Sequence, residues 1–463
     1  MLSILHRYTS GRLIILLITE HALILTGIVI AASLQVHLPG ERNAGYINIW
    51  GGVIVSLVCQ LAFYCADLYD LRVVRSMLQV LGRMLSALGA VCLLLAFVVY
   101  IYPPLQMRPG FVETSFLAII CGILTWRVLL ERGASSMNAG ERILLVGSGD
   151  TIEHLAREIH ARSDLPIHLV GSVAETSSGP LRAVSHVPCV GMLSDLGELI
   201  ERYQPDRVVI GLKERRQHFP VDALLKYRLR GLVVEEASTL FQKVTGRIPI
   251  ENLRPSEIVF SSGFRPSSWL RVWKRSFDIV ASAVGLVGVA PVMVLVACAI
   301  KLNSRGPVLY TQERVGKDGR VFKLLKFRSM RVDAEELSGP RWASEDDPRV
   351  TRIGSVIRKM RMDELPQFFN ILQGDMSFIG PRPERPHFVD RLKMDIPYYD
   401  LRHSVRAGLT GWAQVSYPYG ASVEDAKCKL EYDLFYNKNM SVSLDLLILF
   451  RTVKIVLDKW GAR

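Results

Sequence analysis

Residues 279–300 read IVASAVGLVGVAPVMVLVACAI, and this apolar run decides how the C-terminal part of the chain folds. It is long enough to cross a bilayer, for which a helix needs about 20 apolar residues. Its flanks are basic on both sides, with Lys274 and Arg275 before it and Lys301 and Arg305 after it. Because Lys and Arg collect on the cytoplasmic side of membranes, both ends of the run are predicted to lie there.

Pro291 follows Ala290 near the middle of this run. A proline removes one intrahelical hydrogen bond and kinks or breaks a helix. A helix broken at Ala290-Pro291 can enter one leaflet and return, provided that protein or Ser and Thr side chains cover the freed carbonyl groups. We therefore predict a re-entrant membrane helix over residues 274–302 rather than a helix that spans the membrane.

Four further apolar segments form a block within residues 1–135. They cover residues 13–34, 47–66, 84–102 and 112–130. Each approaches the length that crosses a bilayer, and basic residues such as Arg12 and Arg132 put both ends of the block in the cytoplasm. No small-residue cleavage site follows the first segment, which favours an uncleaved anchor over a signal peptide. Few ionisable residues interrupt the segments, which favours an anchor over a transport role.

The composition agrees with membrane helices that alternate with charged regions. Hydrophobic residues make up 49% of the chain, which still carries 56 Lys and Arg against 44 Asp and Glu. The net charge of +12 could serve nucleic acid, but the basic residues cluster beside apolar runs, where they meet lipid headgroups and phosphates. We therefore expect no nucleic-acid partner. The seven cysteines show neither a disulfide framework nor a metal-binding spacing.

Residues 141–253 change to short β-rich runs between helical stretches, which predicts a Rossmann-like α/β domain with a parallel sheet. The predicted strands lie at 143–146, 167–173, 208–212 and 232–235. The turn Gly147-Ser148-Gly149 follows the first strand and opens a helix, where a phosphate can meet free N–H groups. Ile152 replaces the third glycine of the dinucleotide fingerprint, which favours a structural or oligomerising module over a nucleotide site. The N-terminal block and this domain are compatible with a homodimer.

A linker rich in Ser and Pro, residues 254–271, leads to a last domain over residues 272–463. Residues 307–314 and 320–327 alternate well enough for a small β-hairpin. Its second strand brings Lys326 and Arg328 to one face, which suits a diphosphate and equally suits a solvated edge strand. The predicted fold class is thus membrane α plus α/β: four transmembrane helices, a Rossmann-like domain, and a mainly helical domain with a re-entrant membrane helix and a hairpin.

A second candidate cluster is the dipeptide Asp363-Glu364, which precedes Pro366 and an apolar stretch. Pro366 suits a first helical turn, so that Asp363 is a candidate N-cap and Glu364 faces about 100° away. Phosphoryl transfer needs an in-line nucleophile, a hard cation such as Mg²⁺ and basic groups that take up charge. The two carboxylates, together with Arg358 and Arg382, could supply all three.

Residue chemistry by itself favours ordinary helix capping for this pair. The tripeptide Pro381-Arg382-Pro383 is either a stiff loop that fixes one guanidinium or an extended connector. The last apolar run, residues 444–456, is either an amphipathic interface helix or a core helix.

Several motifs in the last domain occur together. They are Lys274-Arg275 with Phe277-Asp278, Gly306-Pro307, Gln312 with Arg314 and Gly316, Lys326 to Met330, Asp363 to Gln367, Gly374 to Pro383, and Gly408 to Val415. In these motifs the chain resembles the bacterial sugar transferase family, the monotopic phosphoglycosyl transferases that start exopolysaccharide, capsule or O-antigen assembly. The N-terminal block and the α/β domain resemble the long subgroup, the polyprenyl-phosphate hexose-1-phosphate transferases.

The resemblance implies a covalent mechanism at the cytoplasmic face of the bacterial inner membrane. The nucleophile would attack the phosphate that bears the sugar of a UDP-sugar, release UMP, and pass the phosphosugar to polyprenyl (undecaprenyl) phosphate. Glucose or galactose is the sugar that the resemblance suggests. The implied roles are Asp363 as nucleophile, Glu364 as ligand of Mg²⁺, Lys326, Arg358 and Arg382 as phosphate ligands, and Arg328 as their helper.

The segment Leu430-Glu431-Tyr432-Asp433 also resembles one of that family, and Asp433 either supports the site or caps or solvates its helix.

Two positions depart from the pattern of that family. Ala290 stands where serine often precedes the proline, and Ala407 stands where proline usually precedes Gly408, which would loosen a loop near the uridine or the sugar. Two other functions also fit parts of the sequence. A non-catalytic membrane scaffold or nucleotide sensor would use the turn at Gly147. An oxidoreductase or epimerase would use the α/β domain, although the missing third glycine argues against it.

Re-entry of residues 274–302 predicts that tags inserted at Ser267 and at Ser304 both lie in the cytoplasm. Labelling of the two tags by a reagent that cannot cross the inner membrane measures this. Neither tag should react until that membrane is permeabilised. Labelling of the Ser304 tag before permeabilisation would show that the helix spans the membrane instead.

Overall fold

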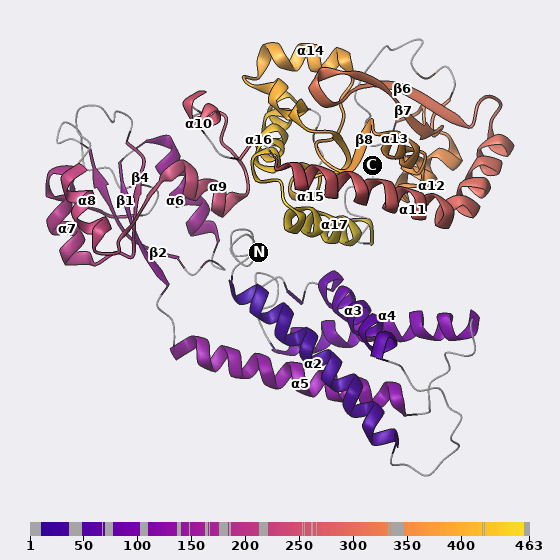
Figure 1. Cartoon of the computed structure of the whole chain (residues 1–463), viewed down its shortest axis with the longest axis horizontal. Coiled ribbons are helices and arrows are strands. Elements are labelled where there is room, and N and C mark those ends of the chain that lie inside the picture. The colour runs from indigo at the N-terminus through magenta and orange to yellow at the C-terminus, as the bar shows by residue number, and fades with distance from the viewer. Residues whose placement is uncertain are drawn as a thin grey trace. The chain divides into compact units, whose positions relative to one another are not determined.

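The computed structural model describes most of the chain. The described residues are 11–36, 49–66, 68–69, 77–101, 110–136, 140–147, 149–162, 165, 167–175, 184, 187–212, 221–251, 253, 255–260, 263–264, 266–331, 334, 347–418, 420 and 422–457. The chain divides into two compact units, Met1–Leu240 and Phe241–Arg463. Figure 1 shows the elements of each unit along the chain.

The first unit begins with four apolar helices. They are α2 (Gly11–Val36), α3 (Ile49–Cys65), α4 (Met77–Ile101) and α5 (Phe111–Ser136). By length and composition α2, α4 and α5 can each cross a membrane, and α3 is a shorter apolar helix. The four predicted segments are thus confirmed as helices of a membrane protein. Helix α4 starts earlier than predicted, because Arg83 donates a hydrogen bond to the carbonyl of Ala66 (2.9 Å) and its charge does not end the helix.

A five-stranded parallel sheet follows in the same unit, which confirms the Rossmann-like domain. Its spatial order is β3-β2-β1-β4-β5. The strands are β1 (Glu141–Val146), β2 (Ile167–Ala174), β3 (Cys189–Met192), β4 (Arg207–Ile210) and β5 (Val233–Glu236). Strand β3 was not predicted, because it is a short edge strand whose residues are all half-buried and show no alternation. The helices are α6 (Asp150–Ala161), α7 (Leu196–Tyr203) after the short turn η2 (Leu193–Asp195), and α8 (Val221–Leu229). Helix α9 (Ala237–Thr245) begins in this unit and ends in the second.

Packing at the first turn of this domain supports its structural interpretation. Gly147 has a φ of 111°, as the tight turn requires. Ile152 is fully buried against Gly211, where an added Cβ would lie 2.3 Å from the Ile152 side chain. The first turn of α6 also carries Asp150 and Glu153, whose charges repel a phosphate at this helix terminus.

The second unit is mainly helical and contains the predicted hairpin. Strands β6 (Leu309–Val315) and β7 (Val321–Phe327) pair antiparallel about the turn η3 (Lys317–Gly319). Two strands that were not predicted, β8 (Met376–Ile379) and β9 (Ala407–Thr410), pair in parallel. The remaining elements are α10 (Pro255–Val259), within the predicted linker, α11 (Ser268–Asn303), α12 (Arg352–Lys359), η4 (Met362–Glu364), α13 (Gln367–Gln373), α14 (Pro386–Asp395), η5 (Tyr399–Ser404), α15 (Trp412–Ser416), α16 (Val423–Asn439) and α17 (Val442–Leu457).

Helix α11 contains the apolar run, and its assignment continues through Ala290 and Pro291. Figure 1 shows the helix bending part-way along its length. Near its start, Arg275 donates hydrogen bonds to the carbonyls of Ile371 (2.7 Å) and Leu372 (2.8 Å). Near its end, Val296 and Ile300 join a cluster that includes Phe327 and Ile357. Both ends of α11 therefore contact the same C-terminal unit, and re-entry at Ala290-Pro291 stays a prediction.

Helix α17 has features of both alternatives predicted for the last apolar run, a core helix and an amphipathic interface helix. Leu444 and Ile448 are fully buried, whereas Leu446, Phe450 and Val453 are exposed. One face thus belongs to the core, and the opposite face is apolar and open.

Residues 241–251 pack on the C-terminal unit, although the predicted boundary at residue 253 groups them with the α/β domain. The indole N–H of Trp412 donates to the carbonyl of Gly246 (2.7 Å). Glu431 accepts hydrogen bonds from Ile248 through its backbone (3.1 Å) and from Ile250 through its side chain (3.1 Å). These contacts tie the segment to α15 and α16.

Gly246 lies at a φ of +69°, and an added Cβ would lie 3.0 Å from the Trp412 ring. We expect Gly246→Ala to destabilise the C-terminal unit by about 1–2 kcal/mol, because left-handed backbone strains an L-residue. Thermal unfolding in detergent measures the loss. Gly288→Ala is the matched control, since that helical glycine has nothing within 4 Å of an added Cβ. Equal melting temperatures for the two variants would contradict the prediction.

Candidate functional site

The dipeptide Asp363-Glu364 lies in η4, a 3₁₀ helix of one turn between α12 and α13. Arg361 precedes it in the left-handed region (φ 57°), which costs a non-glycine residue about 1–2 kcal/mol. The predicted N-cap role of Asp363 is wrong, because Pro366 is the N-cap of α13 and no side chain caps that helix. Leu365 and Pro366 already have helical dihedral angles, so that η4 runs into α13 without a cap.

Glu364 is held by three basic side chains at one carboxylate oxygen. Arg382 donates a hydrogen bond to its Oε1 (2.8 Å), and Lys326 Nζ (3.7 Å) and Arg361 Nη1 (3.6 Å) lie close to the same oxygen. Burial raises the pKa of Glu364, but the charges of Arg382, Lys326 and Arg361 outweigh burial and lower the pKa well below its usual range. Glu364 is therefore ionised at neutral pH.

Asp363 differs from its neighbour in how its carboxylate is paired. It is 9% exposed, and among the described residues no group makes a hydrogen bond or an ion pair with it. Burial raises the pKa of Asp363, while the positive charge of Lys326 opposes this. The dyad thus joins a carboxylate that three cations hold to one that no described cation contacts.

The basic residues around the dyad come from segments that are far apart in sequence. Lys326 lies on β7, Arg358 in the last turn of α12, and Arg382 in the loop after β8. Burial lowers the pKa of Lys326 to about 8, against the opposing effect of Glu364. The charge of Arg358 reaches Asp363, whose pKa it lowers. Two of the three predicted phosphate ligands, Lys326 and Arg382, therefore meet at Glu364, and the third, Arg358, acts on Asp363 through its charge.

Arg328 is the exception. It is buried and donates hydrogen bonds to the carbonyls of Arg305 (2.9 Å) and Ser304 (2.9 Å) and to the Ser304 hydroxyl (2.8 Å). These bonds hold the chain just after α11, and among the described residues no contact joins Arg328 to the dyad. Arg361 was not predicted, although its place three residues before Glu364 was the available signal.

The loop that carries Arg382 begins where two glycines, Gly380 and Gly408, pack closely against each other. A Cβ on Gly408 would lie 2.1 Å from the Gly380 nitrogen, so the backbones of β8 and β9 approach more closely there than a side chain allows. The guanidinium that this loop presents contacts Glu364, which supports the stiff-loop interpretation of Pro381-Arg382-Pro383 over a simple connector.

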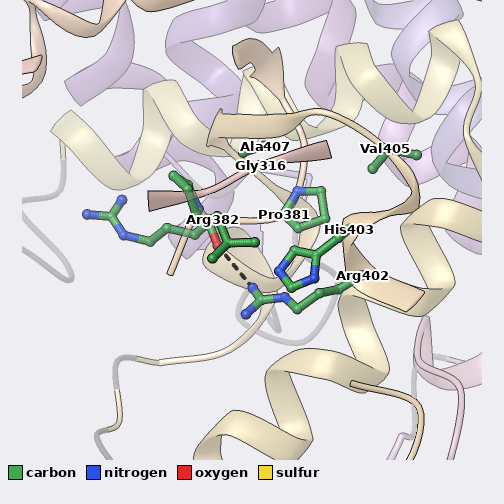
Figure 2. A pocket seen from close by; sticks show the side chains of 9 residues that line it. Gly316, Pro381, Arg382, Arg402, His403, Val405 and Ala407 are labelled. Carbon is green, nitrogen blue, oxygen red and sulfur yellow. Dashed lines mark hydrogen bonds between the residues drawn. The ribbon is translucent and has the colours of Figure 1, made fainter. Parts of the chain in front are cut away.

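A small pocket adjoins this loop (Figure 2). It is lined by Val315, Gly316, Pro381, Arg382, Pro383, Arg402, His403, Val405 and Ala407. In Figure 2 the side chain of Arg382 points away from Arg402 and His403. Ala407, where the resemblance leads one to expect proline, thus lines a pocket directly beside the Arg382 loop.

The donor set around Glu364 suits Mg²⁺ only together with a phosphate. The described residues contain no group of three His, Cys, Asp or Glu side chains that could hold a metal ion. The three described ion pairs of Glu364 are all made at its Oε1. Mg²⁺ commonly binds through one or two carboxylates, substrate phosphates and water, and the dyad fits that pattern.

Comparison with known proteins places the chain in a family. Residues 269–459 match the model of the bacterial sugar transferase family, and residues 65–227 match that of a CoA-binding domain. The exopolysaccharide production protein PSS of Rhizobium leguminosarum bv. phaseoli is 42% identical over 190 residues, which are 39% of this chain and 94% of that protein. The chain belongs to the bacterial sugar transferase family.

Two longer relatives agree in the lipid that their names give and differ in the sugar. The UDP-N-acetylgalactosamine-undecaprenyl-phosphate N-acetylgalactosaminephosphotransferase of Aeromonas hydrophila is 44% identical over 240 residues, 52% of this chain and 56% of that protein. The UDP-glucose:undecaprenyl-phosphate glucose-1-phosphate transferase of Xanthomonas campestris pv. campestris is 29% identical over 434 residues, 88% of this chain and 86% of that protein. The match thus spans little more than half of the Aeromonas protein and most of the Xanthomonas protein.

The low pKa of Lys326, about 8, predicts a pH-dependent affinity for a diphosphate. Lys326 is charged below this pKa and loses its proton above it, so the affinity for UDP should fall above about pH 8, by at most about tenfold per pH unit. Calorimetric titration of the detergent-solubilised protein with UDP measures the change.

Lys326→Arg should remove this decline, because arginine keeps its charge. Lys323→Arg, at an exposed position on the same strand, should keep the wild-type pH dependence. A decline that persists in Lys326→Arg would assign it to another group.

Proposed function

We propose that this chain transfers a hexose 1-phosphate from a UDP-sugar to polyprenyl (undecaprenyl) phosphate. The reaction would be the first membrane step of exopolysaccharide, capsule or O-antigen synthesis. The observation that carries the proposal is the available carboxylate of Asp363, which lies beside a Glu364 that three cations hold. The names of the Aeromonas and Xanthomonas relatives support the two substrate classes.

In the proposed first step, a carboxylate oxygen of Asp363 attacks the phosphorus that bears the sugar. The bond from this phosphorus to the bridging oxygen breaks, and UMP leaves with that oxygen. An acyl phosphate on Asp363 then carries the sugar. In the second step, a phosphate oxygen of the lipid attacks the same phosphorus and frees the Asp363 carboxylate.

Arg382, Lys326 and Arg358 would take up the negative charge of the diphosphate during both steps. Mg²⁺, bound through Glu364 and phosphate oxygens, would supply further positive charge. The contacts of Arg382 and Lys326 with Glu364 hold these cations in place before the substrate arrives. Such preorganised charge stabilises a transition state without a reorganisation cost.

We also propose that the site works at the cytoplasmic face of the bacterial inner membrane. Helix α11 exposes apolar residues that suit lipid tails, among them Val287, Val294 and Leu295. The polyprenyl phosphate would come from the same leaflet, and the soluble UDP-sugar from the cytoplasm. Glucose and galactose are the proposed sugars, and N-acetylgalactosamine, which the Aeromonas relative's name gives, belongs in the same assay panel.

A burst experiment tests the covalent step. Purified enzyme is mixed with each UDP-sugar and Mg²⁺ without lipid acceptor, and we expect about one UMP per enzyme, with the sugar phosphate bound to the protein. Asp363→Asn should abolish both the burst and turnover with polyprenyl phosphate. Asp390→Asn, an exposed carboxylate on α14, is the matched control and should keep the burst.

Normal turnover by Asp363→Asn would remove this residue as the nucleophile. The absence of UMP release from every sugar nucleotide in the panel, with lipid present, would instead support the non-catalytic scaffold.

A further inference from the structure

Every backbone carbonyl from Pro381 to Glu384 accepts a hydrogen bond from outside this loop. The donors, in order, are the N–H of Gly408 (2.8 Å), the guanidinium of Arg402 (3.1 Å), the guanidinium of Arg314 (2.9 Å) and the N–H of Val315 (2.9 Å). Figure 2 shows the bond from Arg402 to the Arg382 carbonyl. Two side-chain donors thus hold the carbonyls of two successive peptide bonds, Arg382–Pro383 and Pro383–Glu384.

The composition of the loop explains why carbonyl donors matter here. Pro381 and Pro383 have no N–H group, so a sheet ladder cannot hold the tripeptide from that side. The carbonyls are the backbone groups through which the neighbouring elements can fix it. The direction of the Arg382 side chain, and hence its contact with Glu364, depends on these bonds.

Arg402 is itself held rigidly. It is 6% exposed, donates a hydrogen bond to the hydroxyl of Tyr399 (2.5 Å) and forms an ion pair with Asp433 Oδ2 (2.8 Å). Asp433 lies on α16 and is 1% exposed, so it is a buried counterion and not the solvated or capping residue that its sequence also allowed. One turn later, Asn437 donates to the carbonyl of Leu401 (2.9 Å) and fixes η5 on α16.

We propose that Arg402 and Arg314 are positioning residues for sugar 1-phosphate transfer. By fixing the backbone at Arg382 they keep its guanidinium on Glu364 and beside Asp363. The described contacts of Arg402 and Arg314 do not include Asp363 or Glu364, so both arginines act through Arg382. This inference rests on the function proposed above.

A double-mutant cycle on the full-length enzyme tests whether Arg402 acts through Arg382. Arg402→Lys keeps a cation opposite Asp433, but an ammonium group cannot reproduce the planar fork that reaches several acceptors at once. UMP release is measured for this substitution in the wild-type background and in the Arg382→Ala background. We expect kcat to fall at least about tenfold in the first background, with KM within about threefold, and less than about threefold in the second.

Glu431→Gln is the matched control. Glu431 is a buried carboxylate on α16, as is Asp433, but it contacts residues 247–250 and not the loop. Its effect should be small and equal in the two backgrounds. Equal fold-losses for Arg402→Lys in both backgrounds would overturn the proposal, since Arg402 would then support the fold without acting through Arg382.

Amide hydrogen exchange gives a readout that does not need turnover. The N–H groups of Gly408 and Val315 donate to the loop, so they should exchange faster in Arg402→Lys and Arg314→Lys but not in Glu431→Gln. Unchanged protection of these N–H groups in both arginine variants would overturn the positioning role, whatever the activity of the wild type. Absence of UMP release from the wild type would overturn the proposed function and would leave the exchange result to be judged by itself. If Arg402→Lys does not fold, Arg314→Lys replaces it in the double-mutant cycle with Arg382→Ala, because Arg314 holds the neighbouring carbonyl of Pro383.

Discussion

The hydrogen bond from Arg382 to the half-buried carboxylate of Glu364 is the contact on which the rest of the site depends. A charge that is largely withdrawn from water is stabilised by pairing, and removal of one partner of a fully buried pair costs about 3–5 kcal/mol. Lys326 and Arg361 complete the pairing at the same oxygen, which leaves no described cation bonded to Asp363. The asymmetry of the two adjacent carboxylates follows from this unequal sharing of cations. The same cations are the groups that an incoming diphosphate would meet.

Sequence patterns within a single segment were enough to predict the helices and strands that such patterns specify. The apolar helices, the parallel sheet and the β6–β7 hairpin follow from run length, alternation and turn residues, and the structure contains them all. The β8–β9 pair joins residues near 377 to residues near 408, and nothing in either short strand indicates the partner. Arg402 and Asp433 could not be matched for the same reason. Their pairing depends on how η5 lies on α16.

The candidate site shows a different limit of sequence reasoning. An Asp-Glu pair before a helix serves equally for capping and for catalysis, because both uses need a carboxylate near N–H groups or cations. The contacts of Lys326 and Arg382 with Glu364 come from distant segments, so the sequence around the pair does not show them. Arg328 illustrates the converse. Its alternate position with Lys326 suggested a shared face, but its guanidinium is used by the carbonyls that follow α11.

The N-terminal block contains one charge pair whose geometry bears on how the protein is made. Glu20 of α2 is fully buried and accepts a hydrogen bond from Arg127 of α5 at 2.7 Å, across a sequence separation of 107 residues. Both residues fall within the apolar windows of their helices. A carboxylate without its partner is costly in hydrocarbon, so α2 by itself carries a cost that its pairing with α5 removes. During synthesis this pair forms only after the chain has been extended as far as α5, which makes the stability of the first helix in the membrane depend on the fourth.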